Sequence, residues 1–232
     1  MKLSIIICAY NERRTILDAV RQARSVVLPE GWQQEVIVID NCSTDGTREL
    51  LQALSLPDVR VILQPCNMGK GTSVRTGIAE ARGDYFVIFD ADLEYEAADL
   101  AHMVAAITPG ETVAVFGSRT LGGRRIYRYA KNYWGVRFLT LAANVLYGGR
   151  LTDIAVGPKL VRLDVVRSLA LSGSGFDLDF ELPCKLLKRG YAIAEVPVAY
   201  HPRTVEEGKK LGAPFRTGLR ALWVIVKHRF VG

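Results

Sequence analysis

Two aspartates that follow an apolar run are the residues in this sequence best suited to chemistry. Asp90 and Asp92 come directly after the apolar and aromatic residues 85–89, and Ala91 separates them. Two carboxylates at this spacing are within reach of one hard cation, and oxygen ligands suit Mg²⁺ or Mn²⁺ that bridges two phosphates. The Asp-X-Asp pattern is also common in surface loops, so the surrounding residues must support a metal site.

Acidic residues follow two other apolar runs and predict an acidic edge. Glu12 comes shortly after the first run, and Asp40 ends the second. Ligands of open α/β sheets bind at the carboxyl ends of the strands, so we expect these residues to meet. Asp40 alone is explained equally well as a helix cap or loop carboxylate. A set of carboxylates would repel a diphosphate unless a cation intervened, which favours a metal site.

A glycine-rich loop, residues 67–72, carries Asn67 and Lys70. It lacks the spacing of a P-loop, and no G-x-G-x-x-G pattern follows the first apolar run. The loop opens a predicted helix, whose free N–H groups together with Lys70 would suit an anion. A plain glycine turn into a helix explains the same residues equally well.

Short apolar runs that alternate with helical stretches must position these residues. We predict strands at residues 3–8, 35–40, 59–63, 85–90 and 112–117, and helices at 12–27, 44–53, 71–81 and 97–107. Ser43 or Thr44 is the predicted cap of the second helix. Because the strands are nearly all apolar, we predict an α/β fold with a mostly parallel central sheet covered by helices.

After Gly123 the alternation of strand and helix stops, and a basic, aromatic segment continues to residue 147. That segment is explained as an aromatic wall for an acceptor or as core. Beyond it we predict a helix at 179–188, a strand at 192–196, a basic loop at 203–210 and an amphipathic helix at 215–230. We expect a single domain, residues 1–232, divided by role at residue 123.

Composition restricts the location and the partners. The 232 residues carry a formal charge of +6 and no apolar run near the ~20 residues of a membrane span. The first residues lack the features of a signal peptide, and the four cysteines are scattered, so we expect a cytoplasmic protein. The charge favours nucleotide phosphates, nucleic acid or acidic lipid headgroups. Nucleic acid is the poorest candidate, because no recognised binding motif accompanies the charge.

Six ordered motifs extend over nearly the whole chain: AYNE at 9–12, DNCSTDGT at 40–47, NMGKG at 67–71, DADLEY at 90–95, GSR at 117–119 and RTVEEGKK at 203–210. In these motifs the sequence resembles the family 2 glycosyltransferases with the GT-A fold, and within them the dolichyl-phosphate mannose synthase-like and polyprenyl-phosphate glycosyltransferase branch. The resemblance implies a Rossmann-like nucleotide-diphospho-sugar transferase fold.

The resemblance implies roles for individual residues. The metal and diphosphate residues are Asp90 and Asp92, and Glu94 is a further metal ligand, since this branch often has Gln there. The family often has Asp where this chain has Asn41 and Gly where it has Cys42. The residues that the resemblance assigns to the nucleoside are Ala9, Tyr10, Glu12 and Asp40. Further residues assigned to the nucleotide-sugar are Asn67, Lys70 and Ala91. The basic residues assigned to donor or acceptor phosphates are Arg119, Arg203 and Lys209.

The reaction implied by the resemblance is an inverting transfer from a nucleoside-diphosphate sugar, either GDP-mannose or a UDP-sugar. A polyprenyl-phosphate acceptor needs no strong protein base, because the second pKa of a phosphate monoester lies near ~6. A hydroxyl acceptor on a soluble compound or polysaccharide needs a base, and Asp153 ranks first among the carboxylates Asp153, Asp177, Asp179 and Glu181. A non-catalytic nucleotide-binding protein is the third hypothesis.

The last predicted helix leaves the question of a membrane open. Its apolar stripe, flanked by basic residues, would suit an anionic membrane surface. Packing on its own domain, or on the second subunit of a homodimer, explains the same stripe. This branch often carries C-terminal transmembrane helices, which this sequence does not show, so we expect any membrane contact to be peripheral. The stripe consists of Phe215, Leu219, Leu222, Trp223, Val226 and Phe230.

Overall fold

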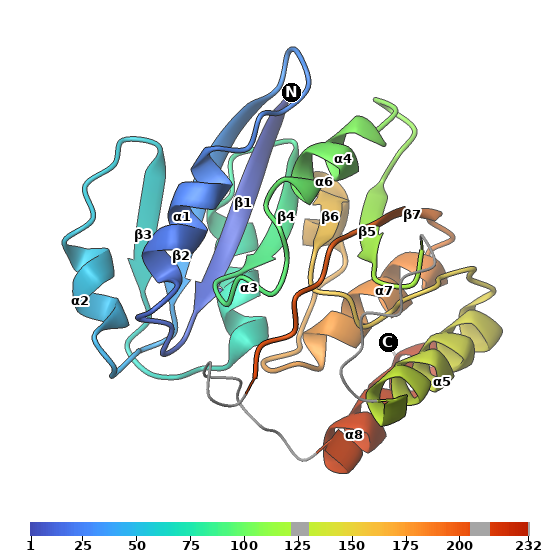
Figure 1. Ribbon diagram of the computed structural model, residues 1–232. Coiled ribbons are helices and arrows are strands. Elements are labelled where there is room, and N and C mark those ends of the chain that lie inside the picture. The colour runs from blue at the N-terminus through green and yellow to red at the C-terminus, as the bar shows by residue number, and fades with distance from the viewer. Residues whose placement is uncertain (122–129, 205–213, 232) are drawn as a thin grey trace.

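An open sheet of seven strands crosses the middle of the molecule (Figure 1). The fold is that of a computed structural model, which describes residues 1–121, 130–204 and 214–231. The strand order is β3-β2-β1-β4-β6-β5-β7, and β6 runs antiparallel to both of its neighbours. The strands are β1 (Lys2–Ala9), β2 (Gln33–Asp40), β3 (Val59–Leu63), β4 (Tyr85–Asp90), β5 (Ala114–Ser118), β6 (Lys159–Arg162) and β7 (Ile193–Pro197).

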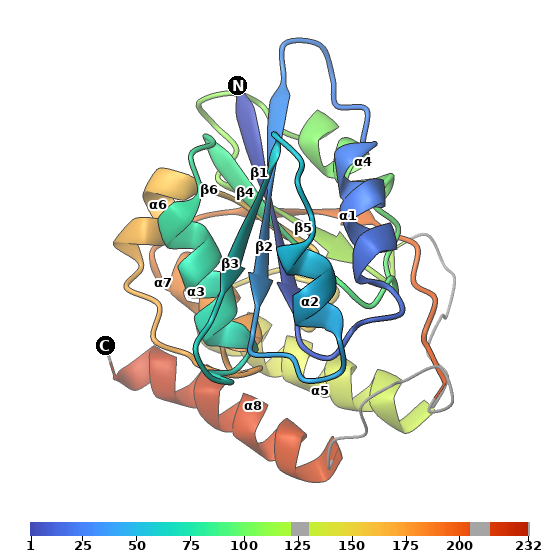
Figure 2. The same cartoon turned by 90° about the vertical axis from the view of Figure 1, so that its left-hand side faces the viewer.

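Helices cover both faces of this sheet. In Figure 2, α1, α2 and α4 lie on one side, and α3, α6 and α7 lie on the other. The central strands are buried along almost their whole length, since both faces pack on helices. The α/β fold with a mostly parallel sheet is therefore confirmed. The helices are α1 (Ile16–Arg24), α2 (Thr47–Gln52), α3 (Lys70–Glu80), α4 (Asp99–Ala105), α5 (Ala130–Tyr147), α6 (Leu163–Ser168), α7 (Leu178–Lys188) and α8 (Pro214–Phe230).

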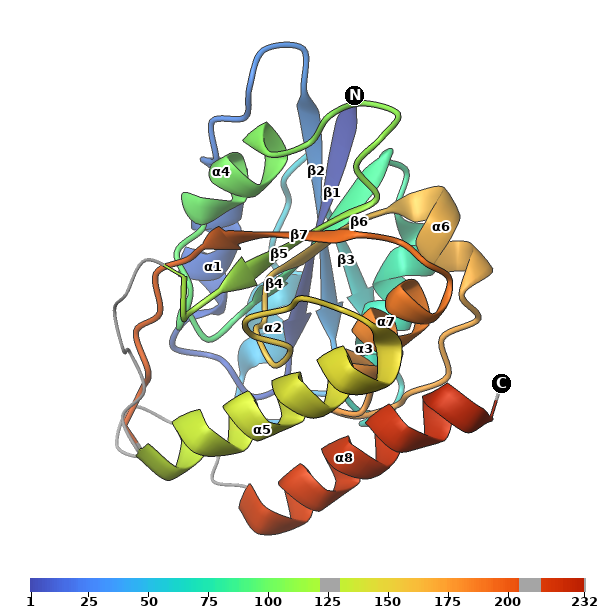
Figure 3. The ribbon, with the colours of Figure 1, turned by 90° about the vertical axis from the view of Figure 1, so that its right-hand side faces the viewer.

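Helices α5 and α8 lie side by side beneath one edge of the sheet (Figure 3). A second, smaller hydrophobic cluster joins them to α7, and it contains Leu139, Phe180 and Ile225. The main core contains residues from both sides of residue 123, including Ile5 of β1 and Leu160 of β6. No helix in the described part of the chain has the length and apolar character needed to cross a membrane.

Three elements differ from the sequence-based expectation. Strand β6 and helices α5 and α6 were not predicted as such, and β6 inserts between β4 and β5. The predicted cap of the second helix is also wrong, because Gly46 precedes α2 and makes no side-chain cap. Ser43 Oγ instead accepts the Asn11 N–H at 2.9 Å, and Asp45 Oδ1 accepts the Thr47 N–H at 3.0 Å.

Candidate active site

The carboxyl ends of β1, β2 and β4 bring the predicted acidic residues to one edge of the sheet, the lower edge in Figure 1. In the strand register Ala9 lies beside Asp40, and Cys8 lies beside Asp90. Alignment of parallel strands therefore places the loops after the three strands next to one another.

Each of these three loops contains a non-glycine residue in the left-handed backbone region. Asn11 after β1 has φ 54°, Cys42 after β2 has φ 61°, and Leu93 after β4 has φ 57°. Such conformations are costly for residues with a Cβ and concentrate at functional sites. The conformation of Cys42 explains why glycine suits this position in the family that the sequence resembles.

Asp90 is paired with a lysine of the protein. Lys70, the first residue of α3, places Nζ 2.8 Å from Asp90 Oδ1 and 3.7 Å from Asp179 Oδ2. Burial opposes the charge of Lys70, but Asp179 and Asp90 outweigh that effect and raise the pKa of Lys70 well above its usual value. Lys70 is therefore a permanent counter-ion for Asp90.

The glycine-rich loop before α3 is held by close packing. A Cβ at Gly71 would lie 2.6 Å from the Gly173 carbonyl oxygen. The Thr72 N–H donates to the Ser174 carbonyl at 3.1 Å, so this helix amide has a protein acceptor. Asn67 Oδ1 accepts hydrogen bonds from Asn41 Nδ2 at 2.9 Å and from the Gly69 N–H at 3.1 Å. These contacts support the plain turn into a helix over a free anion site.

Asp92 has little compensating positive charge. Its Oδ1 accepts the Glu94 N–H at 3.0 Å, and its Oδ2 lies 3.6 Å from Arg203 Nη2. Burial, followed by the neighbouring charge of Asp90, raises the pKa of Asp92 to about 6. A cation beside Asp92 would stabilise its ionised form.

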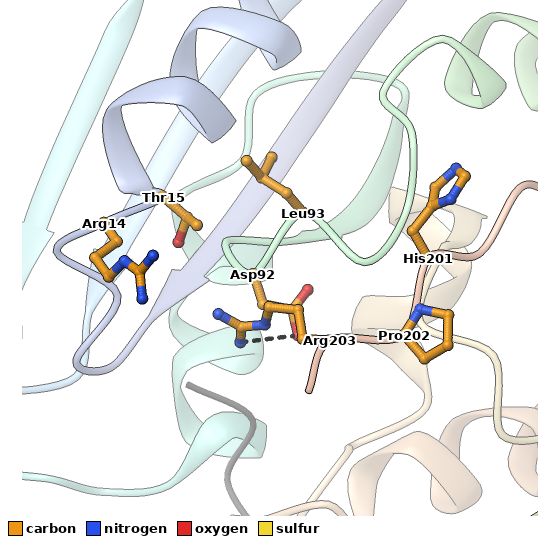
Figure 4. Close-up of a pocket in the computed structure, with 7 residues that line it drawn as sticks. All are labelled: Arg14, Thr15, Asp92, Leu93, His201, Pro202 and Arg203. Atoms are coloured by element: carbon orange, nitrogen blue, oxygen red, sulfur yellow. Dashed lines mark ion pairs between the residues drawn. The ribbon is translucent and has the colours of Figure 1, made fainter. Parts of the chain in front are cut away.

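Asp92 and Arg203 lie together in a pocket of about 590 Å³ (Figure 4). Arg14 and Thr15, just before α1, lie on one side of the pair, and His201 lies on the other. The pocket is therefore formed by segments from the beginning, the middle and the end of the chain.

Arg203 joins two of these segments. Its guanidinium makes two hydrogen bonds to the Glu12 carboxylate, at 2.9 and 3.3 Å, across 191 residues of sequence. Burial opposes the charge of Arg203, but Glu12 outweighs that effect and raises its pKa. Arg203 Nε is buried and has no hydrogen-bond partner among the described residues.

Glu94 faces the segment after β7 rather than an open position. The Tyr200 hydroxyl donates to Glu94 Oε2 at 2.8 Å, and the Arg203 N–H donates to Oε1 at 2.9 Å. The His201 N–H also donates to the Glu94 carbonyl at 2.7 Å. Both carboxylate oxygens hold residues 200–203 in place, and the role of Glu94 as a metal ligand stays a prediction.

The oxygen donors of Asp90 and Asp92 fit Mg²⁺ or Mn²⁺. Among the residues that the structure describes, no three His, Cys, Asp or Glu side chains gather into a metal-binding group. Two carboxylates are nevertheless sufficient, since Mg²⁺ is commonly held by one or two carboxylates together with substrate phosphates and water. The pKa of Asp92 is raised, and a cation bound beside it would offset the neighbouring negative charge of Asp90.

Asp153 is an ion-pair partner of Arg119. Arg119 Nε and Nη2 donate to its two oxygens at 2.7 and 2.9 Å, and the Asp153 residue is 0% exposed. Burial opposes ionisation of Asp153, but Arg119 outweighs that effect and lowers its pKa. The expectation that Asp153 acts as a base is therefore not supported, because an acceptor cannot reach it in this geometry.

Three other predicted residues lie at the same edge but are largely covered. Asp40 is fully buried, and the Ser43 N–H donates to both of its oxygens, at 3.2 and 3.3 Å. Ala9 and Ala91 are also buried, whereas Tyr10 is half-buried. Their roles in nucleoside binding stay predictions.

Lys209, expected to contact phosphate, lies outside the described residues.

Lys159 is a charged residue of the site that the motifs did not indicate. It lies on β6 with no exposed surface, donates to the Val156 carbonyl and places Nζ 3.7 Å from Asp179 Oδ1. Burial lowers its pKa. Asp179 therefore lies between two lysines, Lys70 and Lys159. The only signal in the sequence was a lysine next to the apolar residues Leu160 and Val161.

The sequence profile described as glycosyl transferase family 2 matches residues 4–169. The dolichol-phosphate mannosyltransferase of Pyrococcus furiosus is 29% identical, over 98% of this chain and 64% of the relative. Glycosyltransferase AglJ of Haloferax volcanii is 32% identical, over 86% of this chain and 63% of the relative. The chain thus spans less than two thirds of these two proteins. The undecaprenyl-phosphate mannosyltransferase of Micrococcus luteus is 26% identical, with 99% of both chains covered.

Solved structures of glucosyl-3-phosphoglycerate synthase from Mycobacterium tuberculosis share the fold. A complex with UDP has a TM-score of 0.76 and 20% sequence identity, over 100% of this chain and 81% of that chain. A complex with Mn²⁺, UDP and phosphoglyceric acid has a TM-score of 0.74 and 21% identity, over 100% of this chain and 79% of that chain. At this identity the likeness supports the fold alone, which is that of the GT-A glycosyltransferases.

Proposed function

Because the chain belongs to glycosyl transferase family 2, we propose that it transfers a sugar from a nucleoside-diphosphate sugar to the phosphate of a polyprenyl-type lipid. Two relatives named as dolichol-phosphate and undecaprenyl-phosphate mannosyltransferases support this acceptor and favour mannose as the sugar. The observation that carries the chemistry is the pair Asp90 and Asp92 beside Arg203, at the edge of the sheet where ligands of this fold class bind.

Asp90 and Asp92 would hold Mg²⁺ or Mn²⁺, which offsets the charge that develops on the leaving diphosphate. Lys70 holds the Asp90 carboxylate in place through an ion pair at 2.8 Å. Arg203 donates charge-assisted hydrogen bonds to donor phosphates, and its pair with Glu12 fixes the direction of the guanidinium. A neighbouring synthase structure that contains Mg²⁺ and UDP supports a metal of this kind.

A phosphate acceptor agrees with the environment of the carboxylates in the second half of the chain. Asp153 is held by Arg119, and Glu181 is buried, with hydrogen bonds from Ser172 and Gly173 and an ion pair to Lys185 at 2.7 Å. These two groups are not available as bases. An ionised lipid phosphate needs no such group, because it is itself a nucleophile at neutral pH.

Membrane contact through α5 and α8 completes this proposal. Trp134 and Phe138 of α5 and Trp223 and Phe230 of α8 are between 58% and 76% exposed. Large exposed apolar side chains on two adjacent helices suit the boundary of a bilayer, where a lipid acceptor resides. Figure 3 shows both helices side by side beneath the sheet.

The proposal is tested by incubating the purified chain with labelled GDP-mannose or UDP-glucose, Mg²⁺ or Mn²⁺, and a polyprenyl phosphate. Labelled product in the organic phase, lost on chelation of the metal, is the expected result. Product only in the aqueous phase, with a soluble hydroxyl acceptor, would reject the lipid. Binding of the donor without transfer or hydrolysis would identify a non-catalytic protein.

A further inference from the structure

A second pocket lies between the beginning of α7 and the beginning of α8. Its volume is about 470 Å³, and its walls include Phe176, Phe180, Asp177, Arg216 and Arg220. Of the residues expected to bind the donor and the metal, Asp92 and Arg203 line the other pocket, and none lines this one. This pocket is therefore available to a second ligand.

Two side chains, Phe176 and Lys70, lie between this pocket and Asp90. The Phe176 ring lies 5.8 Å from Lys70 Nζ, and that nitrogen is 2.8 Å from Asp90 Oδ1. The loop that carries Phe176 packs so closely on α3 that a Cβ at Gly69 would lie 2.3 Å from the Ser174 carbonyl oxygen. Phe176 and Lys70 thus lie at the border between the pocket and the acidic residues.

The charge of the pocket favours an anion. Arg216 and Arg220 lie one turn apart on α8, and both side chains are exposed. Asp177 Oδ2 is 3.5 Å from Arg220, whereas its Oδ1 accepts the Gly175 N–H at 2.6 Å. Arg216 has no carboxylate within ion-pair distance in the described part of the chain. Two guanidiniums facing one carboxylate leave a positive charge for a phosphate.

The opposite wall of the pocket is apolar. Phe176 is 65% exposed, although a large aromatic ring gains nothing from contact with water. Phe180 and Ala221 form a buried floor that belongs to the smaller hydrophobic cluster. A ligand with a phosphate at one end and a hydrocarbon next to it satisfies both walls, whereas a fully polar phosphate satisfies only the arginines.

We infer that this pocket is the acceptor subsite and binds an isoprenyl phosphate, an assignment that rests on the function proposed above. Arg216 and Arg220 bind the phosphate, and Phe176 and Phe180 contact the first isoprene units. Phe176 and Lys70, at the border of the two sites, orient the phosphate so that one of its oxygens faces the donor sugar at Asp90 and Asp92.

The first test compares Arg216→Ala with the wild-type chain on a short, water-soluble isoprenyl phosphate in the absence of membranes. We expect the acceptor KM to rise about tenfold, because the variant loses one charge-assisted hydrogen bond to the phosphate. The donor KM should stay within about twofold of the wild-type value. Lys227→Ala is the matched control, because Lys227 is exposed on the same helix outside the pocket, and it should leave both constants unchanged. An unchanged acceptor KM in Arg216→Ala, or an equal rise in Lys227→Ala, would overturn the assignment.

The second test asks which part of the acceptor is recognised. Short isoprenyl phosphate and glycerol 3-phosphate are compared as competitors in the wild-type chain and in Phe176→Ala. If Phe176→Ala weakens competition by the isoprenyl phosphate but not by glycerol 3-phosphate, the subsite is supported. If it weakens competition by both compounds equally, the apolar wall is contradicted. If the wild-type chain transfers sugar to no isoprenyl phosphate, the proposed function and the subsite both fail. Transfer with a normal acceptor KM in Arg216→Ala removes the subsite only.

Discussion

At the scale of single residues, Asp90 and Asp92 are one residue apart but have different surroundings. Lys70 neutralises Asp90 at 2.8 Å, whereas Arg203 lies 3.6 Å from Asp92 and is itself paired with Glu12. The pKa of Asp92 rises to about 6 because the half-buried side chain is partly removed from water and lies near Asp90. Asp92 is therefore the carboxylate that gains most from an added divalent cation.

We predict that Asp92→Asn lowers metal-dependent transfer by at least about a hundredfold, as for loss of one strong electrostatic contact to a transition state. The melting temperature should stay the same or rise, because the change removes a half-buried charge that lies next to the like charge of Asp90. Transfer assays and thermal unfolding check both parts. Asp18→Asn, on an exposed part of α1, is the control, and full activity of Asp92→Asn would contradict the metal site.

The pair Arg119–Asp153 predicts a pH-dependent contribution to stability. The folded pKa of Asp153 is lowered, so its contribution is present above the unfolded pKa of about 3.9 and is lost as pH falls through the folded pKa. Asp153→Asn should lower the free energy of unfolding by about 3–5 kcal/mol at pH 7, because it breaks a buried ion pair with two hydrogen bonds.

Denaturant unfolding at pH 7 and at several values below pH 4 tests this prediction. The difference between the wild-type chain and Asp153→Asn should narrow as pH falls, because protonated Asp153 no longer pairs with Arg119. A difference that is constant over this range would show that the ion pair does not cause it.

At the scale of elements, the start of α3 depends on contact with the loop that precedes α7. We predict that Gly71→Ala lowers the free energy of unfolding by about 1–3 kcal/mol, because its Cβ would lie 2.6 Å from the Gly173 carbonyl. Donor binding should weaken as well, since Lys70 begins this helix. Gly135→Ala is the matched control in α5: nothing lies within 4 Å of its Cβ, so it should stabilise by about 0.5–1 kcal/mol. Denaturant titration measures the free energy of unfolding of both variants. A change in the same direction in both would contradict the packing argument.

Helices α5 and α8 predict binding to anionic vesicles. The double variant Phe138→Ser with Trp223→Ser should bind at least about tenfold more weakly, because each buried aromatic side chain contributes about 1.5–3 kcal/mol. Vesicle flotation measures this binding. Val27→Ser is the control, since Val27 is 85% exposed in the connection between α1 and β2. An equal loss in both variants would rule out a specific contact through these helices.

Sequence patterns predicted well the strands that consist mainly of apolar residues. The segment 85–90 matches β4 because its apolar side chains are buried, and the segment 59–63 matches β3, whose residues are half-buried and apolar except for Arg60. Strand β6 was missed because it has only four residues and begins with a charged lysine, Lys159, whose acidic neighbour comes from α7. Helix α5 was missed because its apolar residues point both to the core and to solvent, as Leu139 and Phe138 do.

The candidate site was predicted in part for a related reason. Asp90, Asp92 and Glu12 follow strands, so a rule about strand ends brings them together. The partners of Glu94 come from residues 200–203, more than a hundred positions away, and no local pattern indicates them. The same is true of Arg119 for Asp153, which is why a carboxylate expected to act as a base proved to be an ion-pair partner.

At the scale of the whole molecule, ligand and stability are coupled. We predict that Mn²⁺ with the correct nucleoside diphosphate raises the melting temperature. At a ligand concentration of a hundred times the Kd, the free energy of unfolding should increase by about 2.7 kcal/mol. For a chain of this length each kcal/mol corresponds to about 2–4 °C. Thermal scans with GDP and with UDP would identify the base, and chelation should remove the shift. A shift that survives chelation would contradict metal-assisted binding.

The contact between Glu12 and Arg203 has a consequence for how the protein is made. These residues are 191 positions apart, so the ribosome must add 191 residues after Glu12 before the pair can form. The strands that precede Glu12, Asp90 and Asp92 emerge earlier and can pair with one another first. During synthesis the acidic edge therefore exists without its arginine, and the Glu12–Arg203 contact forms only after residue 203 has left the ribosome.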